Sequence, residues 1–402
     1  MQEIGFMTNF NQPTELATIT ALIAKSYDID LIYLRPKDVN IDSGTVRGKV
    51  LNNGKWKTKS TKIPRFIDIS PYCFKKKNKE IMDYLRANTF LSDNRENTLS
   101  KQKLQDILKE DSNFSHLVIP TQKIKSFEEL LNYVKVYKKT VLKPIRGLRG
   151  KGVHFLEMEN EDTFRIGFET EMKTLNLQEL EEFYYRTIHR KGYILQKYVS
   201  SRTTQGDPFD CRIHVEKDGS GNWSVAKMYI RIGIGQSIIS NVNQGGGISD
   251  PKPFLKANFK DNWSDIYDSL KEVGESIPKK MEELRNTHIM YMGMDIGIDR
   301  SGKLYLFEVN DGPSTIALIS EVAYHRSNYY SYAIRELLDI PDKGRNKNKN
   351  KNSGQIDKLQ QEVKQLRLEK AKKDKEINQI KSSTSWKMTS FIRKVGKLLK
   401  NK

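Results

Sequence analysis

The chain has few of the features that mark secreted, zinc-binding or membrane-spanning proteins. Its 402 residues include only two cysteines, Cys73 and Cys211, which lie far apart. We therefore expect packing roles for both and no disulfide framework, which fits a reducing cytoplasm. The six histidines are scattered without metal-ligand spacing, which argues against a zinc site. No apolar run reaches the roughly 18 residues that a spanning helix needs, and the N-terminus lacks the pattern of a secretion signal.

Positive charge is abundant but unevenly distributed. The formal net charge is +19, and the segment from Pro341 to Lys402 alone has 19 Lys and Arg against 6 Asp and Glu, which leaves only +6 for the first 340 residues. A basic tail can bind nucleic acid, anionic lipid or an anionic polymer, and charge alone does not distinguish them. Because nothing outside the tail supports nucleic acid, we do not expect it as a partner.

The pattern of predicted elements divides the chain into five parts. Residues 1–100 alternate strand, helix and strand, which is typical of a small α/β domain. Residues 101–340 predict mainly strands with helical insertions, and therefore an α+β domain. A low-complexity basic linker expected to be disordered, a short imperfect coiled coil and a basic amphipathic helix follow at 341–354, 355–382 and 383–402.

The two last parts suggest partners. Lys370 and Lys373 occupy core positions of the coiled coil, so its homodimer is expected to be marginal. The final helix has apolar residues on one side and lysines on the other, a pattern of helices that lie on anionic membrane surfaces. The expected location is the cytoplasm, with the tail able to hold the protein at the inner face of the cell membrane.

Local periodicity also predicts individual elements. Ser126 and Glu129 form a plausible capping box before an apolar helical pattern. Helices are predicted at 13–25, 101–110, 126–138, 261–287 and within 314–338. Strands are predicted at 62–70 and 192–200, and hairpins over 209–233 and 294–313.

A basic, glycine-rich loop follows the predicted strand that ends in Lys143. Glycines let the backbone approach a polyphosphate, and the cationic side chains can neutralise it. An ordinary basic turn has the same composition, so this segment alone leaves both interpretations open. The candidate phosphate-binding residues are Lys143, Arg146, Gly147, Arg149, Gly150, Lys151 and Gly152.

The strand at 192–200 offers a second, weaker candidate. Alone, its end is more often only the end of a buried strand. Beside a phosphate loop, it is where an adenine could bond to the backbone while a side chain reaches the ring edge. The residues concerned are Gln196, Lys197, Tyr198 and Val199.

The hairpin over 209–233 carries charge on one face. Asp210 and Arg212 share a face of its first strand, and Lys227 and Arg231 share a face of its second. A solvated sheet face is the alternative. The functional interpretation is a cationic wall beside the phosphates, in which Asp210 and Lys227 contribute to ATP binding and Arg231 stabilises charge on a transferring phosphoryl group or a tetrahedral intermediate.

The hairpin over 294–313 is the most informative segment. It places Asp295, Glu308 and Asn310 at the ends of apolar strands. Carboxylate and amide oxygens suit a hard cation such as Mg²⁺, which usually shares its shell with phosphate. Buried carboxylates need a partner, and a salt bridge to Lys or Arg is the alternative. Asp299 and Arg300 are assigned to the turn.

A second glycine-rich stretch, Asn243–Gly247, reads NQGGG and predicts a loop that no regular element would hold.

Taken in order, these segments resemble the spore-coat-associated YheC/YheD-like branch of the ATP-grasp superfamily. The matching stretches are VLKPIRGLRGKGV, QKYV, DCRIHV, AKMYIRIG, NQGGG and MDIGIDRSGKLYLFEVNDGPS, over about residues 100–340. The N-terminal unit, with RPKDV and the segment around Trp56, is similar to the pre-ATP-grasp domain of that branch.

The resemblance implies a fold and a reaction. ATP would lie between two α+β subdomains, with its phosphates on Lys143 and the glycine loop, adenine at 196–199, and Mg²⁺ on the three oxygen ligands. A carboxylate would be activated as an acyl phosphate and attacked by an amine to give an amide, ADP and phosphate. Arg231 and Arg212 would stabilise the transition state. The second glycine loop, with Asn243, Gly245, Gly246 and Gly247, would close on the acceptor.

The tail adds a further resemblance. SSTSWKMTSFIRKVGKLL is similar to the C-terminal tails of glycosyltransferases from bacterial surface-polysaccharide clusters. The combination predicts a carboxylate–amine ligase acting on a cell-envelope polysaccharide or its precursor. A kinase-like ATP-grasp enzyme that phosphorylates a hydroxyl, and a non-catalytic scaffold recruited by coiled coil and tail, are the alternatives. Product analysis separates the first two, and intact site residues argue against the scaffold.

Overall fold

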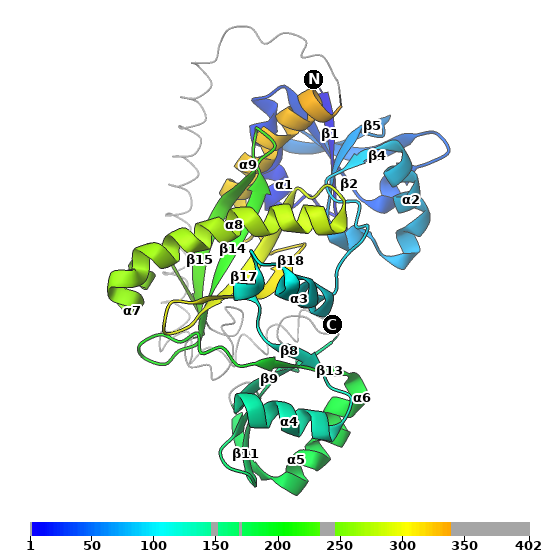
Figure 1. The fold of residues 1–402 in the computed structure, drawn as a ribbon. Helices are drawn as coiled ribbons and strands as arrows, with labels where there is room; N and C mark the ends of the chain where they lie inside the picture. Colours follow the sequence, from blue (N-terminus) through cyan, green and yellow to red (C-terminus); the bar gives the residue numbers. More distant parts are fainter. Residues whose placement is uncertain (1, 146–151, 169–170, 234–245, 339–402) are drawn as a thin grey trace, which may run out of the picture. The chain divides into compact units, whose positions relative to one another are not determined.

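The computed structural model describes residues 2–145, 152–168, 171–233 and 246–338 (Figure 1). These residues form three β-sheets of seven, six and five strands. None of the helices in these ranges is long and apolar enough to span a membrane. The predicted linker, coiled coil and tail helix lie outside the described residues.

The first sheet belongs to the N-terminal α/β unit. Its strand order is β3-β4-β2-β1-β6-β7, with β5 beside β4, and β1 pairs in parallel with both β2 and β6. Such parallel strands are buried on both faces, which explains their nearly continuous apolar sequences. The elements are β1 (Gln2–Met7), α1 (Glu15–Lys25), β2 (Ile29–Leu34), β3 (Val39–Asn40), β4 (Thr45–Asn52), β5 (Lys55–Lys62), β6 (Phe66–Ile69), α2 (Lys79–Asn88) and β7 (Phe90–Leu91).

The predicted strand–helix–strand order of this unit is confirmed, with one boundary corrected. The strand predicted over 62–70 begins only at Phe66, because Lys62 still belongs to β5 and Pro64 has no N–H to donate to a ladder. Helix α1 begins after Thr14, whose hydroxyl accepts from the Ala17 N–H at 3.1 Å.

The second sheet is antiparallel, in the order β12-β11-β10-β9-β13-β8. The predicted helix after Ser126 is present, but its capping box is half formed, because the Glu129 carboxylate accepts from the Lys125 N–H. The elements are β8 (Thr121–Lys123), α4 (Phe127–Tyr137), β9 (Lys139–Pro144), β10 (His154–Met158), β11 (Thr163–Phe168), β12 (Glu171–Asn176), α5 (Leu177–Phe183), α6 (His189–Lys191) and β13 (Tyr193–Lys197).

The third sheet is also antiparallel, in the order β16-β15-β14-β17-β18. Both predicted hairpins are present in it, with turns at 218–222 and 299–303. The elements that form or cover it are α3 (Lys101–Glu110), β14 (Phe209–Lys217), β15 (Trp223–Ile232), β16 (Gly247–Ser249), α7 (Pro251–Phe259), α8 (Trp263–Arg285), β17 (Tyr291–Ile298), β18 (Leu304–Asn310) and α9 (Ile319–Tyr332).

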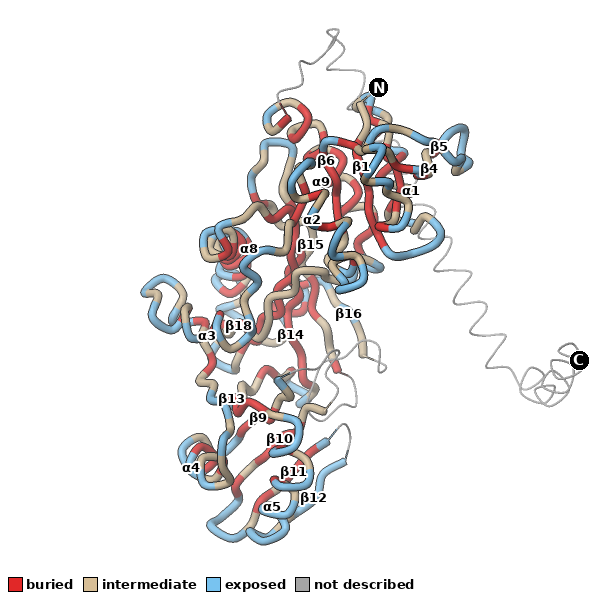
Figure 2. Tube along the Cα trace, turned by 90° about the vertical axis from the view of Figure 1, so that its right-hand side faces the viewer, coloured by how far each residue is buried: buried red, intermediate tan, exposed pale blue. Residues whose placement is uncertain are grey.

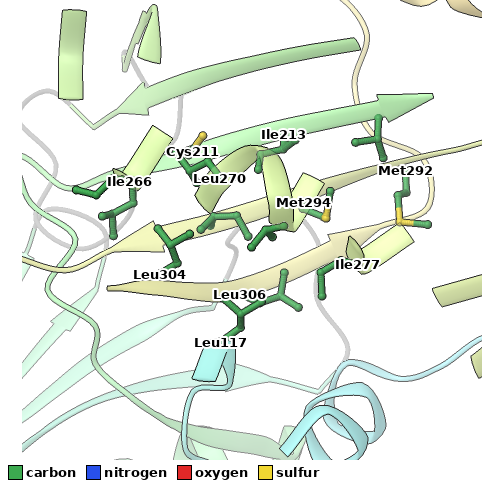
Figure 3. Close-up of a cluster of buried hydrophobic side chains, with 14 of the residues drawn as sticks. Leu117, Cys211, Ile213, Ile266, Leu270, Ile277, Met292, Met294, Leu304 and Leu306 are labelled. Atoms are coloured by element: carbon green, nitrogen blue, oxygen red, sulfur yellow. The ribbon is translucent and has the colours of Figure 1, made fainter. Parts of the chain in front are cut away.

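The two faces of this sheet differ in chemistry. Cys211, Ile213 and Met294 lie on the apolar face, which α8 covers, and form the largest hydrophobic cluster (Figures 1 and 3). The other face carries the even-numbered polar residues of β14, and these are buried too (Figure 2). A polar face held away from water must satisfy its charges internally, so it is where the candidate site is built.

Candidate functional site

A ladder of two arginines and two aspartates crosses the polar face of the third sheet. In the register of β15, β14 and β17, Asp210 is opposite Arg231 and Arg212 is opposite Asp295. The Arg231 guanidinium donates to both Asp210 oxygens, at 2.6 and 2.7 Å. Arg212 Nη2 and Arg231 Nη2 each lie 3.0 Å from Asp295 Oδ2. The arginines of the predicted cationic wall therefore alternate with carboxylates, and the role of this wall beside phosphates stays a prediction.

This ladder sets the charge states of its members. Burial alone would raise the pKa of Asp295, but Arg231 and Arg212 outweigh that effect and hold it below its ordinary value. Burial acts to lower the pKa of Arg231, while Asp210 and Asp295 raise it above its usual range. Asp295 and Arg231 therefore stabilise each other's charged forms. An incoming anion meets arginines that are already oriented by carboxylates.

The three predicted oxygen ligands lie where the end of β18 pairs with the middle of β17, so the prediction that Asp295 lies at a strand end is wrong. Asp295 is the cross-strand partner of Glu308, and Asn310 Nδ2 lies 3.5 Å from Asp295 Oδ2. The Glu308 carboxylate bonds to Lys101 Nζ at 2.8 Å. Asp295 and Glu308 therefore both form the salt bridges that were the alternative to a metal site. A bound metal would compete with the arginines and Lys101 for their carboxylate oxygens.

These residues fit a hard divalent cation. Two carboxylates and one amide supply only oxygen ligands once the amide is turned to present its oxygen, as Mg²⁺ prefers. The register and the short Asp295–Asn310 distance hold them at one place. No group of three or more His, Cys, Asp or Glu in the described ranges could hold a metal, and this candidate has two carboxylates and an amide.

Lys143 reaches this hairpin from the second sheet. Its Nζ bonds to Gln196 Oε1 at 2.5 Å and lies 5.8 Å from the centroid of the Phe307 ring, next to Glu308 in the chain. The pKa of Lys143 is lowered to about 8, because burial and the nearby Lys101 together outweigh the raising effect of Glu308 and Asp295. No carboxylate of the described residues bonds to the Lys143 ammonium, so it is well placed to receive an anion.

At the strand end where we predicted adenine binding, some of the hydrogen-bond donors already have partners within the protein. Gln196 is buried and bonds to Lys143 and to Thr121 Oγ1. The backbone N–H of Lys197 donates to the Pro120 carbonyl at 3.0 Å, and that of Tyr198 to the Lys139 carbonyl at 3.0 Å. An adenine here would therefore depend on other backbone groups of 196–199, including Val199, or on side chains.

Several predicted residues lie in or beside the two glycine loops. Gly152 is described and has φ +76°, and a Cβ there would lie 3.3 Å from Tyr193 Oη, so the position favours glycine. Gly246 is described, and Gly247 begins strand β16, so the prediction that no regular element would hold it is wrong. Edge pairing with Ile232 explains the difference. The loop residues outside the described ranges are Arg146, Gly147, Arg149, Gly150, Lys151, Asn243 and Gly245.

Lys227 lies farther along the hairpin than the other charged residues. It is opposite His214, and its Nζ bonds to Glu321 of α9 at 2.8 Å. A phosphate of ATP would therefore have to compete with Glu321 of α9 for the Lys227 ammonium.

Two residues at the site were missed by sequence reasoning. Lys101 is the first residue of α3, and only tertiary structure pairs it with Glu308. Phe307 is the extra residue of a β-bulge, and a Cβ on Gly297 would lie only 2.1 Å from its ring. A glycine inside an apolar strand is the signal that indicates such a close approach.

Comparison with known proteins decides the family. The profile of the YheC/D-like ATP-grasp family matches residues 92–335, more than half of the chain and all of the described site residues. This chain belongs to the YheC/D-like ATP-grasp family. The predicted family and fold class are thereby confirmed.

Relatives within the family are distant in sequence. The chain is 22% identical over 347 residues to the endospore coat-associated protein YheC of Bacillus subtilis (strain 168), covering 83% of this chain and 95% of YheC. It is also 22% identical over 299 residues to YheD of the same organism, covering 68% of this chain and 62% of YheD.

Solved structures show weaker likenesses. An ATP-grasp ligase of Chryseobacterium gregarium, in complex with ADP and a leader and core peptide, has a TM-score of 0.45 at 13% identity, covering 84% of this chain and 97% of that one. The macrocyclase MdnC of Microcystis aeruginosa MRC, bound with its precursor peptide MdnA, has a TM-score of 0.48 at 10% identity, covering 84% and 100%.

Proposed function

We propose that this YheC/D-like ATP-grasp protein is a Mg²⁺- and ATP-dependent ligase that joins a carboxylate to an amine. The observation that carries the proposal is the meeting of Lys143, from the second sheet, with the Asp295–Glu308–Asn310 hairpin of the third. The groups that we propose for phosphate and for metal thus come from two sheets to one place, as binding of a nucleoside triphosphate requires.

Each group has a proposed task. Lys143 and Lys101 neutralise phosphate oxygens, and Asp295, Glu308 and Asn310 hold Mg²⁺, which screens phosphate charge when bound. Arg231 and Arg212, held by the carboxylates of the ladder, stabilise negative charge that develops on the transferring phosphoryl group and on the attacked carbonyl.

The reaction balances in two transfers. A carboxylate oxygen of the substrate bonds to the γ-phosphorus as the bond to ADP breaks. The amine nitrogen then bonds to the activated carbonyl carbon, phosphate leaves, and the amine loses a proton. The test is ADP and phosphate release with panels of carboxylates and amines, combined with mass analysis of the product. An amide supports the proposal, whereas a phosphoester would make the protein a kinase.

The finer proposal concerns the acceptor, which the tail resemblance suggests is a cell-envelope polysaccharide or its precursor.

Deleting residues 384–402 should release the protein from phosphatidylglycerol vesicles and leave ADP release intact, because the basic amphipathic tail is expected to supply the lipid contact. Phosphatidylcholine vesicles are the control for charge dependence. Vesicle binding that survives the deletion would remove the tail from this role.

The Lys143 ammonium gives ATP binding a defined pH dependence. Bound phosphate favours the charged amine, so the Kd for Mg-ATP should rise with pH above about 8, by up to about tenfold per pH unit. Lys143→Arg should flatten this profile, because a guanidinium stays charged. Lys139→Arg, at a lysine of the same strand that pairs with Glu157, should keep the wild-type profile. An unchanged profile in Lys143→Arg would contradict the role of this ammonium.

A further inference from the structure

A basic pocket lies beyond the carboxyl ends of β1 and β2 in the N-terminal unit. It has a volume of about 230 Å³, and its lining includes Asn11, Arg35, Asp38, Arg47 and Lys49. In open α/β sheets, ligands bind outside the carboxyl ends of the strands. The lining comes from the loop after β1, from β2 and the turn after it, and from β4 and β5, so the pocket lies on the β2 side of β1.

The pocket has a surplus of positive charge. Arg35 is neutralised by a two-pronged bond to Asp38, at 2.8 and 2.7 Å, and its third contact is with Asn11. Within the described ranges, Lys49 Nζ bonds only to the uncharged Gln12 Oε1, at 2.7 Å. Arg47 is exposed and has no ion-pair partner among the residues that the structure describes. Two cations therefore remain for an anionic ligand.

The pocket is built on an ordered frame. Tyr33 Oη lies 2.8 Å from the Phe10 carbonyl and 2.9 Å from the Gln12 carbonyl, which fixes the loop after β1. Gly48 lets β4 approach β2, since a Cβ there would lie 2.6 Å from Ile32. The cationic side chains thus stand on a paired sheet and an anchored loop, which reduces the entropy lost on binding.

The loops at the carboxyl ends of β1 and β6 adjoin the β17–β18 hairpin, which carries the proposed metal ligands. Gly312, just past the ligand Asn310, packs so closely on Pro71 after β6 that a Cβ would lie 2.8 Å from the Pro71 ring. The neighbouring Tyr72 carbonyl accepts a hydrogen bond from Asn9, in the loop after β1. Phe10 and Tyr72 are 65% and 62% exposed, so two aromatic rings are accessible on the loops that link the pocket to the hairpin.

We infer that the substrate is an acidic chain with at least two anionic groups. One carboxylate is presented to the phosphate-binding site, and a second anionic group, carboxylate or phosphate, is held by Arg47 and Lys49 in the basic pocket. The aromatic rings of Phe10 and Tyr72 contact the part of the substrate between them. This inference rests on the proposed ligase function for the first group, while the pocket itself can be tested without ATP.

The test measures binding of three probes to the full-length protein by calorimetry: trigalacturonate, triglutamate and inorganic tripolyphosphate. Arg47→Ala/Lys49→Ala should weaken binding of the preferred probe at least about tenfold, the effect of losing charge-assisted hydrogen bonds. The matched control is Lys57→Ala/Lys62→Ala, which removes two exposed lysines from the same hairpin outside the pocket. Its binding should equal that of the wild type.

Each outcome decides something. Equal loss in both double variants would assign binding to general positive charge and overturn the inference, as would the absence of binding by every probe. Preference for tripolyphosphate over both carboxylates would identify the held group as phosphate, and the reverse as carboxylate. Mg-ATP binding is measured in parallel. Selective probe binding without ATP binding would reject the ligase proposal and support the anion-binding pocket. ATP binding without probe binding would reject the pocket and leave the ligase proposal standing.

Discussion

Glu308→Gln should reduce substrate-stimulated ADP release by about 10²- to 10³-fold, the loss typical of removing one preorganised electrostatic contact from a transition state. The amide retains the shape of the side chain but removes the negative charge that Mg²⁺ needs. It also leaves Lys101 without the carboxylate to which it is bonded at 2.8 Å. The Mg²⁺ concentration for half-maximal turnover should rise in the same variant.

A second glutamate provides the matched control. Glu157 bonds to Lys139 at 2.8 Å on another sheet, so Glu157→Gln breaks an ion pair of equal length away from the hairpin. Its turnover and Mg²⁺ requirement should stay at wild-type values. If Glu308→Gln retained wild-type turnover, Glu308 would not be a metal ligand, and the ion pair with Lys101 would be its whole role.

Arg326→Leu should lower the free energy of unfolding by about 3–5 kcal/mol, because it leaves two buried carboxylates without their cation. Arg326 of α9 lies 3.1 Å from Asp68 of β6 and 3.2 Å from Glu216 of β14. The side chains of Asp68 and Glu216 are 2% and 0% exposed. This cluster connects the N-terminal sheet to the third sheet, so its loss should destabilise both.

Chemical denaturation followed by circular dichroism measures the change. Arg335→Leu is the control, since Arg335 pairs with Glu336 at the surface, and it should cost less than about 1 kcal/mol. Adding Asp68→Asn and Glu216→Gln to Arg326→Leu should recover part of the loss, because neutral amides are cheaper to bury than unpaired carboxylates. Equal stability of Arg326→Leu and the control would mean that water or other groups satisfy these carboxylates.

Burial and Arg326 act in opposite directions on the pKa values of the two carboxylates in this cluster. Burial raises the pKa of Asp68 despite the opposing effect of Arg326. Burial acts to raise that of Glu216 as well, but Arg326 and His214 outweigh it and the pKa is lowered. Because its folded-state pKa is depressed, ionised Glu216 stabilises the protein above the ordinary glutamate range, and this contribution is lost as pH falls through the lowered value.

Most elements could be predicted because their patterns are local. The alternation over 209–233 reflects the two faces of β14 and β15, and Ser126 marks the start of α4 as its N-cap. Element ends were less well predicted where a neighbouring strand decided them. Gly247 illustrates this, since only pairing with Ile232 across the sheet makes it part of a strand.

The candidate site shows the same division. Asp295, Glu308 and Asn310 could be predicted together because they lie on adjacent strands of one hairpin, where spacing in sequence determines spacing in space. The pairing of Lys101 with Glu308 could not, because a contact between residues far apart in the chain leaves no periodic trace. The arginine–aspartate ladder was partly predicted, but its alternation of charge needed the order of three strands.

By itself, the sequence determined the fold class, the family motifs and the residue types able to hold ATP and Mg²⁺, since these depend on short-range patterns of polarity, glycine and oxygen ligands. Only the tertiary structure decided which charges neutralise one another, that Lys143 of the second sheet meets Phe307 of the third, and that Arg47 and Lys49 line a pocket whose carboxylate, Asp38, is bonded to Arg35. The physical reason is that electrostatic pairing depends on distance in space, which chain connectivity leaves open until the sheets pack together.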